Sequence, residues 1–458
     1  MIKTLVAGTI ALFLGGAPAL AAPPAALEGD WSGALQTPRG DLRLVLHVRS
    51  GAGGVAVVVD SPDQGVTGLA ADHARYENGS LVFEIPSVHG RYEGHWDDAR
   101  QILAGIWTQN GATLALDLGR GTSKAPDRPQ TPKAPFPYGT EDVTFTNGAA
   151  TGVVLAGTLT LPKASAPYPA IVLVAGSGPN DRDETIAGHK PFAVIADALT
   201  RRGLAVLRFD KRGVGKSSGN YGAATTADFA SDAAAAAAYL RSRRDIAPDG
   251  IGLLGHSEGG LIGPLVADAD SKLAYLILLA GPGVRGDQIL VAQNRAIGQA
   301  AGLTAAQLDA AASVNRSLYD LVAAERDDAK LKAALEGKLA AAGIPESARP
   351  SEIAELTSTW LRSFITYDPG PALSKLRLPV LALIGSKDLQ VPPAQNIPVL
   401  RAALAGNPLA QVETIDGVNH LFQTTETGLP EDYARIAETI SPAVLAKIGD
   451  FAVAYGRR

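Results

Sequence analysis

Short segments of alternating apolar and polar residues fill the chain from Leu27 to Leu118. Residues 42–48, 81–85 and 113–118 are examples, and Gly, Asp or Asn interrupts the sequence between such segments. A period of two is typical of half-buried antiparallel strands. We therefore predict a small β-sandwich or β-barrel domain over residues 27–120.

The pattern changes after Glu141, where continuous apolar runs alternate with stretches of helical periodicity. The apolar runs cover residues 170–174, 204–209, 251–254, 275–279 and 380–384. Such runs, separated by helices, predict a parallel sheet with helices on both faces, and hence an α/β domain over residues 139–458. About a hundred mostly helical, Ala-rich residues lie between the last two runs. This is too long for an ordinary connection and predicts an inserted helical cap at about 285–372.

Two further segments complete the predicted organisation. Residues 121–138 contain five prolines among polar residues, a composition typical of a semi-rigid extended linker. Residues 1–21 combine Lys3, an apolar run over 5–14 and the small residues Ala19 and Ala21. This is the pattern of a secretory signal peptide, so we expect export to the periplasm or the medium, with an uncleaved anchor as the alternative.

Composition narrows the function classes. The 458 residues carry a net charge of −5 without charge blocks, which argues against nucleic acid or an anionic membrane as the main partner. There is no cysteine, so thiol catalysis, thiolate metal sites and disulfides are excluded. We expect no membrane association after signal cleavage, and the sequence leaves the oligomeric state open.

The predicted β-domain holds three of the four tryptophans, Trp31, Trp96 and Trp107. We interpret them as core residues in preference to an aromatic ligand platform. Four histidines also lie in this domain without regular metal-ligand spacing, so we predict no metal site there. They are His47, His73, His89 and His95.

Two segments match the pattern G-x-S-x-G, in which a serine is exposed on a tight turn between a strand and a helix. Ser257, in residues 255–259, follows an apolar run and precedes a potentially helical stretch. Ser217, in residues 215–219, lies in a polar Gly-rich loop. The context favours Ser257 as a nucleophile.

A serine nucleophile needs a general base and an acid that orients it, in the chain order Ser, Asp or Glu, His. His420 is the only histidine after Ser257, since His189 and His256 precede it, and is the predicted base. Asp388 is the predicted acid because it follows the apolar run that begins at Pro379. Asp416 is the alternative, but it lies only four residues before His420.

Acyl transfer also needs donors for a developing oxyanion. The backbone N–H of Glu258, directly after the nucleophile, is one candidate. The loop 175–180 supplies the other, with Ser177 as first choice and Gly178 as second. Pro179 removes a backbone N–H and no Walker lysine follows, so the loop does not fit a phosphate site. We predict neither a cofactor nor a metal.

These residues stand within a longer set of motifs. Their segments are 176–183 (GSGPNDRD), 189–192 (HKPF), 209–217 (FDKRGVGKS), 255–260 (GHSEGG), 385–388 (GSKD) and 419–420 (NH). In this order they resemble the α/β-hydrolase superfamily, and more narrowly exported bacterial carboxylesterases with an N-terminal β-domain. The resemblance implies an α/β-hydrolase fold and the assignment Ser257, His420 and Asp388 as catalytic residues.

The expected function is a cofactor-independent serine hydrolase that cleaves small-molecule carboxylic esters, with short acyl groups held in an apolar pocket under the cap. A serine peptidase similar to prolyl oligopeptidase is the first alternative, although about 90 residues are too few for a propeller. A non-catalytic binding protein that uses the β-domain is the second.

Overall fold

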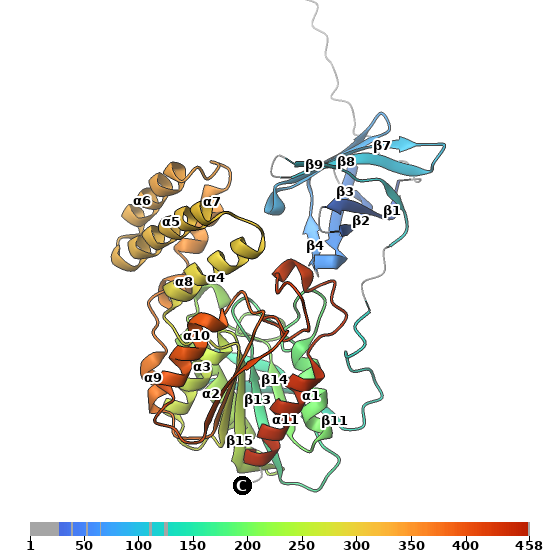
Figure 1. The fold of residues 1–458 in the computed structure, drawn as a ribbon. Coiled ribbons are helices and arrows are strands. Elements are labelled where there is room, and N and C mark those ends of the chain that lie inside the picture. Colours follow the sequence, from blue (N-terminus) through green and yellow to red (C-terminus); the bar gives the residue numbers. More distant parts are fainter. Residues whose placement is uncertain are drawn as a thin grey trace, which may run out of the picture. The chain divides into compact units, whose positions relative to one another are not determined.

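The computed structural model of the chain describes residues 27–37, 40–51, 54–64, 66–109, 112–122 and 127–456 (Figure 1). The predicted signal peptide, residues 1–21, lies outside the described residues. The chain divides into two compact units, Met1–Ala125 and Pro126–Arg458.

The described part of the first unit forms one ten-stranded antiparallel sheet in the order β4-β3-β2-β1-β10-β8-β7-β6-β5, with β9 paired to β8. Its elements are β1 (Gly29–Thr37), β2 (Gly40–Gly51), β3 (Gly54–Ser61), η1 (Pro62–Gln64), β4 (Val66–Ala70), β5 (Asp72–Glu77), β6 (Ser80–Ile85), η2 (Pro86–Val88), β7 (Gly90–Asp97), β8 (Ile102–Gln109), β9 (Ala112–Ala115) and β10 (Leu118–Arg120).

This sheet curls around one core. β4 and β5 follow each other directly although they lie at opposite ends of the strand order, and the Ala71 N–H between them donates to the Val57 carbonyl at 3.0 Å. Trp31 and Trp107 are buried in the core, as predicted, and Trp96 packs edge-on against Trp31 with ring centroids 5.8 Å apart. The alternating segments therefore form one strongly curved sheet and not a sandwich of two stacked sheets.

His47 lies between two carboxylates on neighbouring strands. Its Nδ1 is 2.9 Å from Asp30 Oδ1, and its Nε2 is 3.0 Å from Asp60 Oδ2. The hydrogen bonds to Asp60 and Asp30 raise the pKa of His47. In the described ranges, no group of three or more His, Asp or Glu side chains could hold a metal ion.

The second unit contains an eight-stranded sheet in the order β11-β12-β14-β13-β15-β16-β17-β18. Its strands are β11 (Gly139–Thr146), β12 (Val154–Leu161), β13 (Tyr168–Val174), β14 (Ala205–Phe209), β15 (Ile246–His256), β16 (Tyr275–Leu279), β17 (Val380–Gly385) and β18 (Ala410–Ile415). β11 and β12 pair antiparallel, and the sheet is parallel from β14 to β18. This is the predicted α/β fold class.

Helices cover both faces of this sheet because its central strands are apolar on both sides. One face packs against α2 (Thr226–Ser242), α3 (Gly259–Ala269), α9 (Gly370–Lys375) and α10 (Pro393–Ala403). The other packs against α1 (Pro191–Arg201) and α11 (Pro442–Gly456). The short 3-10 turns η3 (Tyr221–Ala223) and η4 (Pro430–Asp432) lie in loops.

A helical cap is inserted between β16 and β17 (Figure 1). It comprises α4 (Gly286–Ala300), α5 (Ala305–Ala324), α6 (Asp328–Ala341), α7 (Arg349–Leu356) and α8 (Thr359–Phe364). The cap has its own small core, which includes Leu331 and Leu335 of α6 and Leu361 of α8. Among the described residues, no helix is both long enough and apolar enough to span a membrane.

The second half of the predicted linker packs onto the second unit. The Arg128 guanidinium donates to the carbonyls of Ala187 at 3.1 Å, Ala434 at 2.5 Å and Ile436 at 3.0 Å. The Gln130 side chain donates to the Ile440 carbonyl at 2.7 Å and accepts from its N–H at 3.0 Å. Proline keeps this segment free of helix and strand, but its polar side chains satisfy backbone groups of the unit and hold it in place.

Candidate active site

Ser257 occupies the turn between β15 and α3. Its φ is +52°, a left-handed conformation that is uncommon for a residue with a side chain. The Ser257 N–H donates to the Leu279 carbonyl of β16 at 2.8 Å, which holds the turn in place. The surroundings thus stabilise a strained backbone at the predicted nucleophile, as is common at functional sites.

The glycines around Ser257 allow this turn to form. A Cβ on Gly255 would lie 1.9 Å from the Gly259 carbonyl oxygen, and a Cβ on Gly259 would lie 2.1 Å from the Val174 carbonyl oxygen. Both distances are far below van der Waals contact. The end of β13, where the predicted oxyanion loop begins, therefore packs directly against the first turn of α3.

Asp388 and His420 meet at the carboxyl ends of β17 and β18. Asp388 Oδ2 is 2.9 Å from His420 Nδ1, and both side chains are buried. The other carboxylate oxygen, Oδ1, accepts from the backbone N–H groups of Gln390 at 2.9 Å and Val391 at 2.7 Å. The loop after β17 thus fixes the carboxylate, which in turn fixes the imidazole.

The alternative acid, Asp416, has another partner. Its Oδ1 accepts from the Ser386 hydroxyl at 2.9 Å, and the same hydroxyl oxygen accepts from the Gly417 N–H at 2.8 Å. Asp416 therefore stabilises the loop between β18 and His420.

His256 connects the serine turn to His420. Its Nε2 is 3.0 Å from the His420 carbonyl oxygen, and the two ring centroids are 4.9 Å apart. Its Nδ1 is 3.0 Å from Glu184 Oε1, which also accepts from the Gly176 N–H at 2.6 Å. Burial opposes the charged form of His256, but the Glu184 carboxylate outweighs it and raises the pKa of His256.

The two candidate donors of loop 175–180 differ in position. Ser177 lines the same cavity as Ser257 and Glu258. Gly178 is not among the residues that line this cavity. The structure therefore places Ser177 and Glu258 beside Ser257 in the wall of one cavity, whose lining does not include Gly178.

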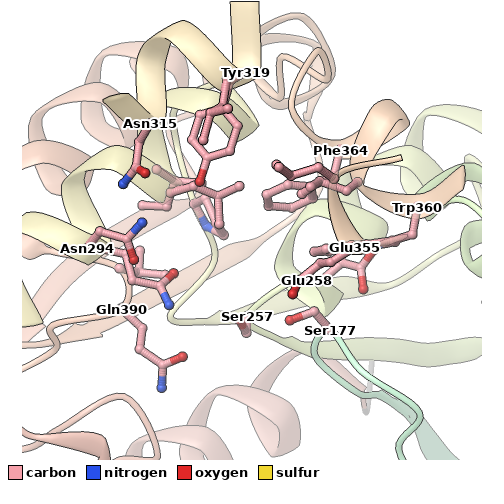
Figure 2. A pocket seen from close by; sticks show the side chains of 18 of the residues that line it. Ser177, Ser257, Glu258, Asn294, Asn315, Tyr319, Glu355, Trp360, Phe364 and Gln390 are labelled. Atoms are coloured by element: carbon pink, nitrogen blue, oxygen red, sulfur yellow. The ribbon is translucent and has the colours of Figure 1, made fainter. Parts of the chain in front are cut away.

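The cavity above Ser257 has a volume of about 450 Å³ and lies between the cap and the sheet. Figure 2 shows Asn294, Asn315 and Tyr319 on one side and Trp360 and Phe364 on the other. The acidic side chains of Glu352 and Glu355 also line it. The wall therefore mixes polar and apolar groups, whereas the sequence suggested an apolar pocket.

Ser217 has a structural role in the described chain. Its Oγ donates to the Asp210 carbonyl at 2.7 Å and accepts from the Ala156 N–H at 2.9 Å. Both partners are backbone groups: Ala156 belongs to β12, and Asp210 directly follows β14. Ser217 is also buried, so its hydroxyl joins β12 to the segment after β14 and is not presented to a ligand.

Sequence reasoning missed three residues around the site: Glu184, Lys211 and Trp360. Lys211 Nζ lies 3.2 Å from Glu258 Oε2, and Trp360 Nε1 donates to Glu258 Oε1 at 2.7 Å. Lys211 and Glu184 are charged but buried. Nothing in the order of apolar and polar residues distinguishes such charges from exposed ones.

Comparison with known families gives one assignment. Residues 189–426, just over half of the chain, match the family described as "Serine aminopeptidase, S33". The match includes Ser257, Asp388 and His420 but not the first unit.

Among individual proteins, Esterase EstD from Thermotoga maritima is 29% identical over 283 residues, which are 61% of this chain and 61% of the esterase. The chain thus matches less than two thirds of the length of this curated relative. Among solved structures, the esterase Pf2001 of Pyrococcus furiosus is 16% identical with a TM-score of 0.43, covering 69% of this chain and 91% of that one. The α/β-hydrolase GrgF of Penicillium sp. sh18 is 16% identical with a TM-score of 0.44, covering 70% and 100% respectively.

Proposed function

The chain belongs to the serine aminopeptidase S33 family of α/β-hydrolases, and on this premise we propose that it is a serine hydrolase that cleaves carboxylic esters. The observation that carries the proposal is the buried Asp388–His420 pair, 2.9 Å apart, in which the His420 carbonyl oxygen lies 3.0 Å from Nε2 of His256, the residue before the strained Ser257. The likeness to an esterase supports the same chemistry.

In the proposed reaction, His420 Nε2 takes the proton of the Ser257 hydroxyl as its oxygen attacks the ester carbonyl. Asp388 holds the Nδ1–H of His420 and stabilises the imidazolium that forms. His420 then gives the proton to the departing alcohol, which leaves an acyl group on Ser257. A water molecule, deprotonated by His420, releases the acid and restores the serine.

The carbonyl oxygen becomes negatively charged when the serine attacks. We assign its stabilisation to the backbone N–H groups of Glu258 and Ser177, which belong to residues that line the cavity with Ser257. Loss of one such donor typically costs about 3 kcal/mol of transition-state stabilisation.

The experiment that tests the proposal combines labelling with turnover. A fluorophosphonate probe should modify Ser257, as located by peptide mapping, and Ser257→Ala should lower p-nitrophenyl butyrate turnover by about 10⁴-fold or more. Ser217→Ala is the matched control and should retain turnover. Modification of Ser217, or full activity of Ser257→Ala, would contradict the proposal.

We propose short acyl esters as substrates because a cavity of about 450 Å³ is small and Leu318, Leu361 and Phe364 line its cap side. kcat/KM should be highest for p-nitrophenyl acetate or butyrate and should fall for octanoate and longer chains. A steady rise toward long chains would contradict this size limit.

A second candidate is an aminopeptidase. Two observations favour it: the family description, and the side chains of Glu352 and Glu355 in the cavity wall, where they could bind a substrate ammonium. An aminopeptidase should cleave aminoacyl-p-nitroanilides faster than N-acetylated analogues and lose this preference in Glu355→Gln. Turnover of p-nitrophenyl butyrate without cleavage of the anilides would contradict the aminopeptidase candidate and support the esterase proposal.

We also propose that residues 1–21 direct export. N-terminal sequencing of protein from a fractionated bacterial host should then begin at Ala22. An intact N-terminus in the membrane fraction would indicate the uncleaved anchor.

A further inference from the structure

The side chain of Glu258 has a position that the proposed reaction does not use. Its backbone N–H is assigned to the oxyanion, but its carboxylate is buried away from solvent. Oε1 accepts from the Thr226 hydroxyl at the start of α2 and from Trp360 Nε1 of the cap, both at 2.7 Å. Oε2 lies 3.2 Å from Lys211 Nζ. One carboxylate thus connects α2, the cap and the loop after β14.

Lys211 extends this network to the other oxyanion donor. Its ammonium is buried, lies 4.3 Å from the centre of the Phe229 ring and donates to the Gly176 carbonyl at 2.5 Å. The Asn180 side chain donates to the same carbonyl oxygen at 2.9 Å. The Gly176 carbonyl is therefore held by two donors, one of them charged.

The Gly176 carbonyl and the Ser177 N–H are parts of one peptide group. A trans peptide is planar, so its C=O and N–H point in opposite directions. A group that fixes the carbonyl therefore also fixes the direction of the N–H. Lys211 and Asn180 hold the carbonyl on one side of the peptide, which sets the N–H of Ser177 on the other.

We propose that Lys211 and Glu258 are positioning residues for the oxyanion site, an inference that rests on the proposed serine hydrolase function. The Lys211 ammonium fixes the Gly176–Ser177 peptide, and the Glu258 carboxylate fixes the ammonium. Both oxyanion donors are thus tied to one buried ion pair. A buried charge needs partners that compensate the cost of its desolvation. For Lys211 these partners are the Glu258 carboxylate and the Gly176 carbonyl, which belong to the two segments that carry the proposed oxyanion donors.

The test replaces the pair with neutral residues of similar shape. Lys211→Met/Glu258→Gln leaves no unpaired charge, and glutamine keeps an acceptor for Thr226 and Trp360. Because an oxyanion contact matters mainly in the transition state, kcat for p-nitrophenyl butyrate should fall about 10- to 100-fold while KM stays within about twofold. Lys216→Met is the matched control, since this lysine is exposed, and it should keep the parent kcat.

A second readout separates positioning from general damage to the fold. A trifluoromethyl ketone forms a hemiketal whose oxygen occupies the oxyanion site, after Ser257 oxygen adds to the ketone carbon and the serine proton passes to His420. Its Ki should rise by about the same factor as kcat falls, while the pH midpoint of kcat/KM should not move. A parent-like kcat and Ki in the double variant would overturn the inference.

Two controls keep the result interpretable. If Ser257→Ala retains activity, the proposed function itself fails. If Ser257→Ala loses activity but the double variant behaves like the parent, only the positioning role is rejected. If the double variant does not fold, Glu258→Gln alone should lower kcat about 3- to 10-fold, and an unchanged kcat in that variant would also overturn the inference.

Discussion

The backbone beside Ser257 is packed so closely that Gly259 has no space for a side chain. The carbonyl of Val174 occupies the position where a side chain of Gly259 would begin. A glycine in a helix normally lowers stability relative to alanine, so its presence at the start of α3 reflects this close approach of backbones.

Gly259→Ala should therefore lower the free energy of unfolding by about 1–3 kcal/mol and reduce ester turnover, because the end of β13 must move away from α3. Thermal unfolding and p-nitrophenyl butyrate kinetics measure both effects. Gly337→Ala in α6 is the matched control, since nothing lies within 4 Å of its added Cβ. That substitution should stabilise the chain by about 0.5–1 kcal/mol. Equal stability changes in the two variants would contradict the packing argument.

At the scale of elements, a hydrogen bond of α8 joins the cap to the site. Trp360 donates to Glu258 and also stacks on Phe364 with ring centroids 4.8 Å apart. The stacking belongs to the cap alone, whereas the hydrogen bond crosses from the cap to the serine turn.

Trp360→Phe removes the cross-connection and preserves an aromatic ring for stacking. Glu258 keeps Thr226 and Lys211, so we expect kcat within about twofold of the parent and a 3- to 10-fold higher KM for p-nitrophenyl butyrate. Trp96→Phe is a control, because it also removes an indole donor to a carboxylate, Asp98. A fall in kcat with an unchanged KM would contradict this role of the cap.

A second element-scale prediction concerns β1, β2 and β3, which His47 bridges through Asp30 and Asp60. Its pKa is raised in the folded state by these two partners. Protonated His47 therefore stabilises the fold fully below its unfolded pKa of about 6.5, and this contribution is lost as pH rises through the folded pKa. The three side chains are partly exposed, so solvent screening keeps the effect within about 1 kcal/mol.

Unfolding monitored by tryptophan fluorescence reports mainly on this unit, which holds three of the four tryptophans. The unfolding temperature should be a few degrees higher near pH 5.5 than near pH 8.5, after subtraction of the trend in His47→Gln. His95→Gln is the matched control, since His95 Nδ1 lies 3.1 Å from the Ser80 hydroxyl, and it should keep the parent pH dependence. An identical pH trend in His47→Gln and the parent would contradict the bridge.

At the scale of the whole molecule, the sequence predicted the α/β sheet, the inserted cap and the residues that meet at the strand ends. Apolar runs and chain order determine those features, because parallel strands bring their carboxyl ends to one edge. The preference for Asp388 over Asp416 could also be made from the sequence, since only Asp388 follows β17 directly. Family membership is confirmed by the match over residues 189–426.

Other features depend on contacts between distant segments. Lys211 and Glu258 are 47 residues apart, and Trp360 lies 102 residues beyond Glu258. Their pairing follows from three-dimensional packing and leaves no periodic signal in the sequence. The same reason explains why the prolines of residues 121–138 predicted a linker, while Arg128 and Gln130 are bound to the second unit.

These contacts predict where the chain can be shortened. A protein that begins at Pro126 should keep the parent kcat/KM for p-nitrophenyl butyrate, because Arg128 and Gln130 retain their partners. A protein that begins at Gly139 should unfold at a temperature several degrees lower, since backbone groups of Thr439 and Ile440 then lose Gln130. Equal thermal stability of the two truncations would contradict this prediction.

The partners of Arg128 and Gln130 have a consequence for how the protein is made. Apart from Ala187, which lies 59 residues after Arg128, they lie 306 to 310 residues further along the chain. The distant partners are synthesised only near the end of translation. The segment can therefore complete its docking only when almost the entire polypeptide has been made. A nascent chain that stalls before residue 434 therefore leaves the segment without its contacts to residues 434–440 and more accessible to proteases.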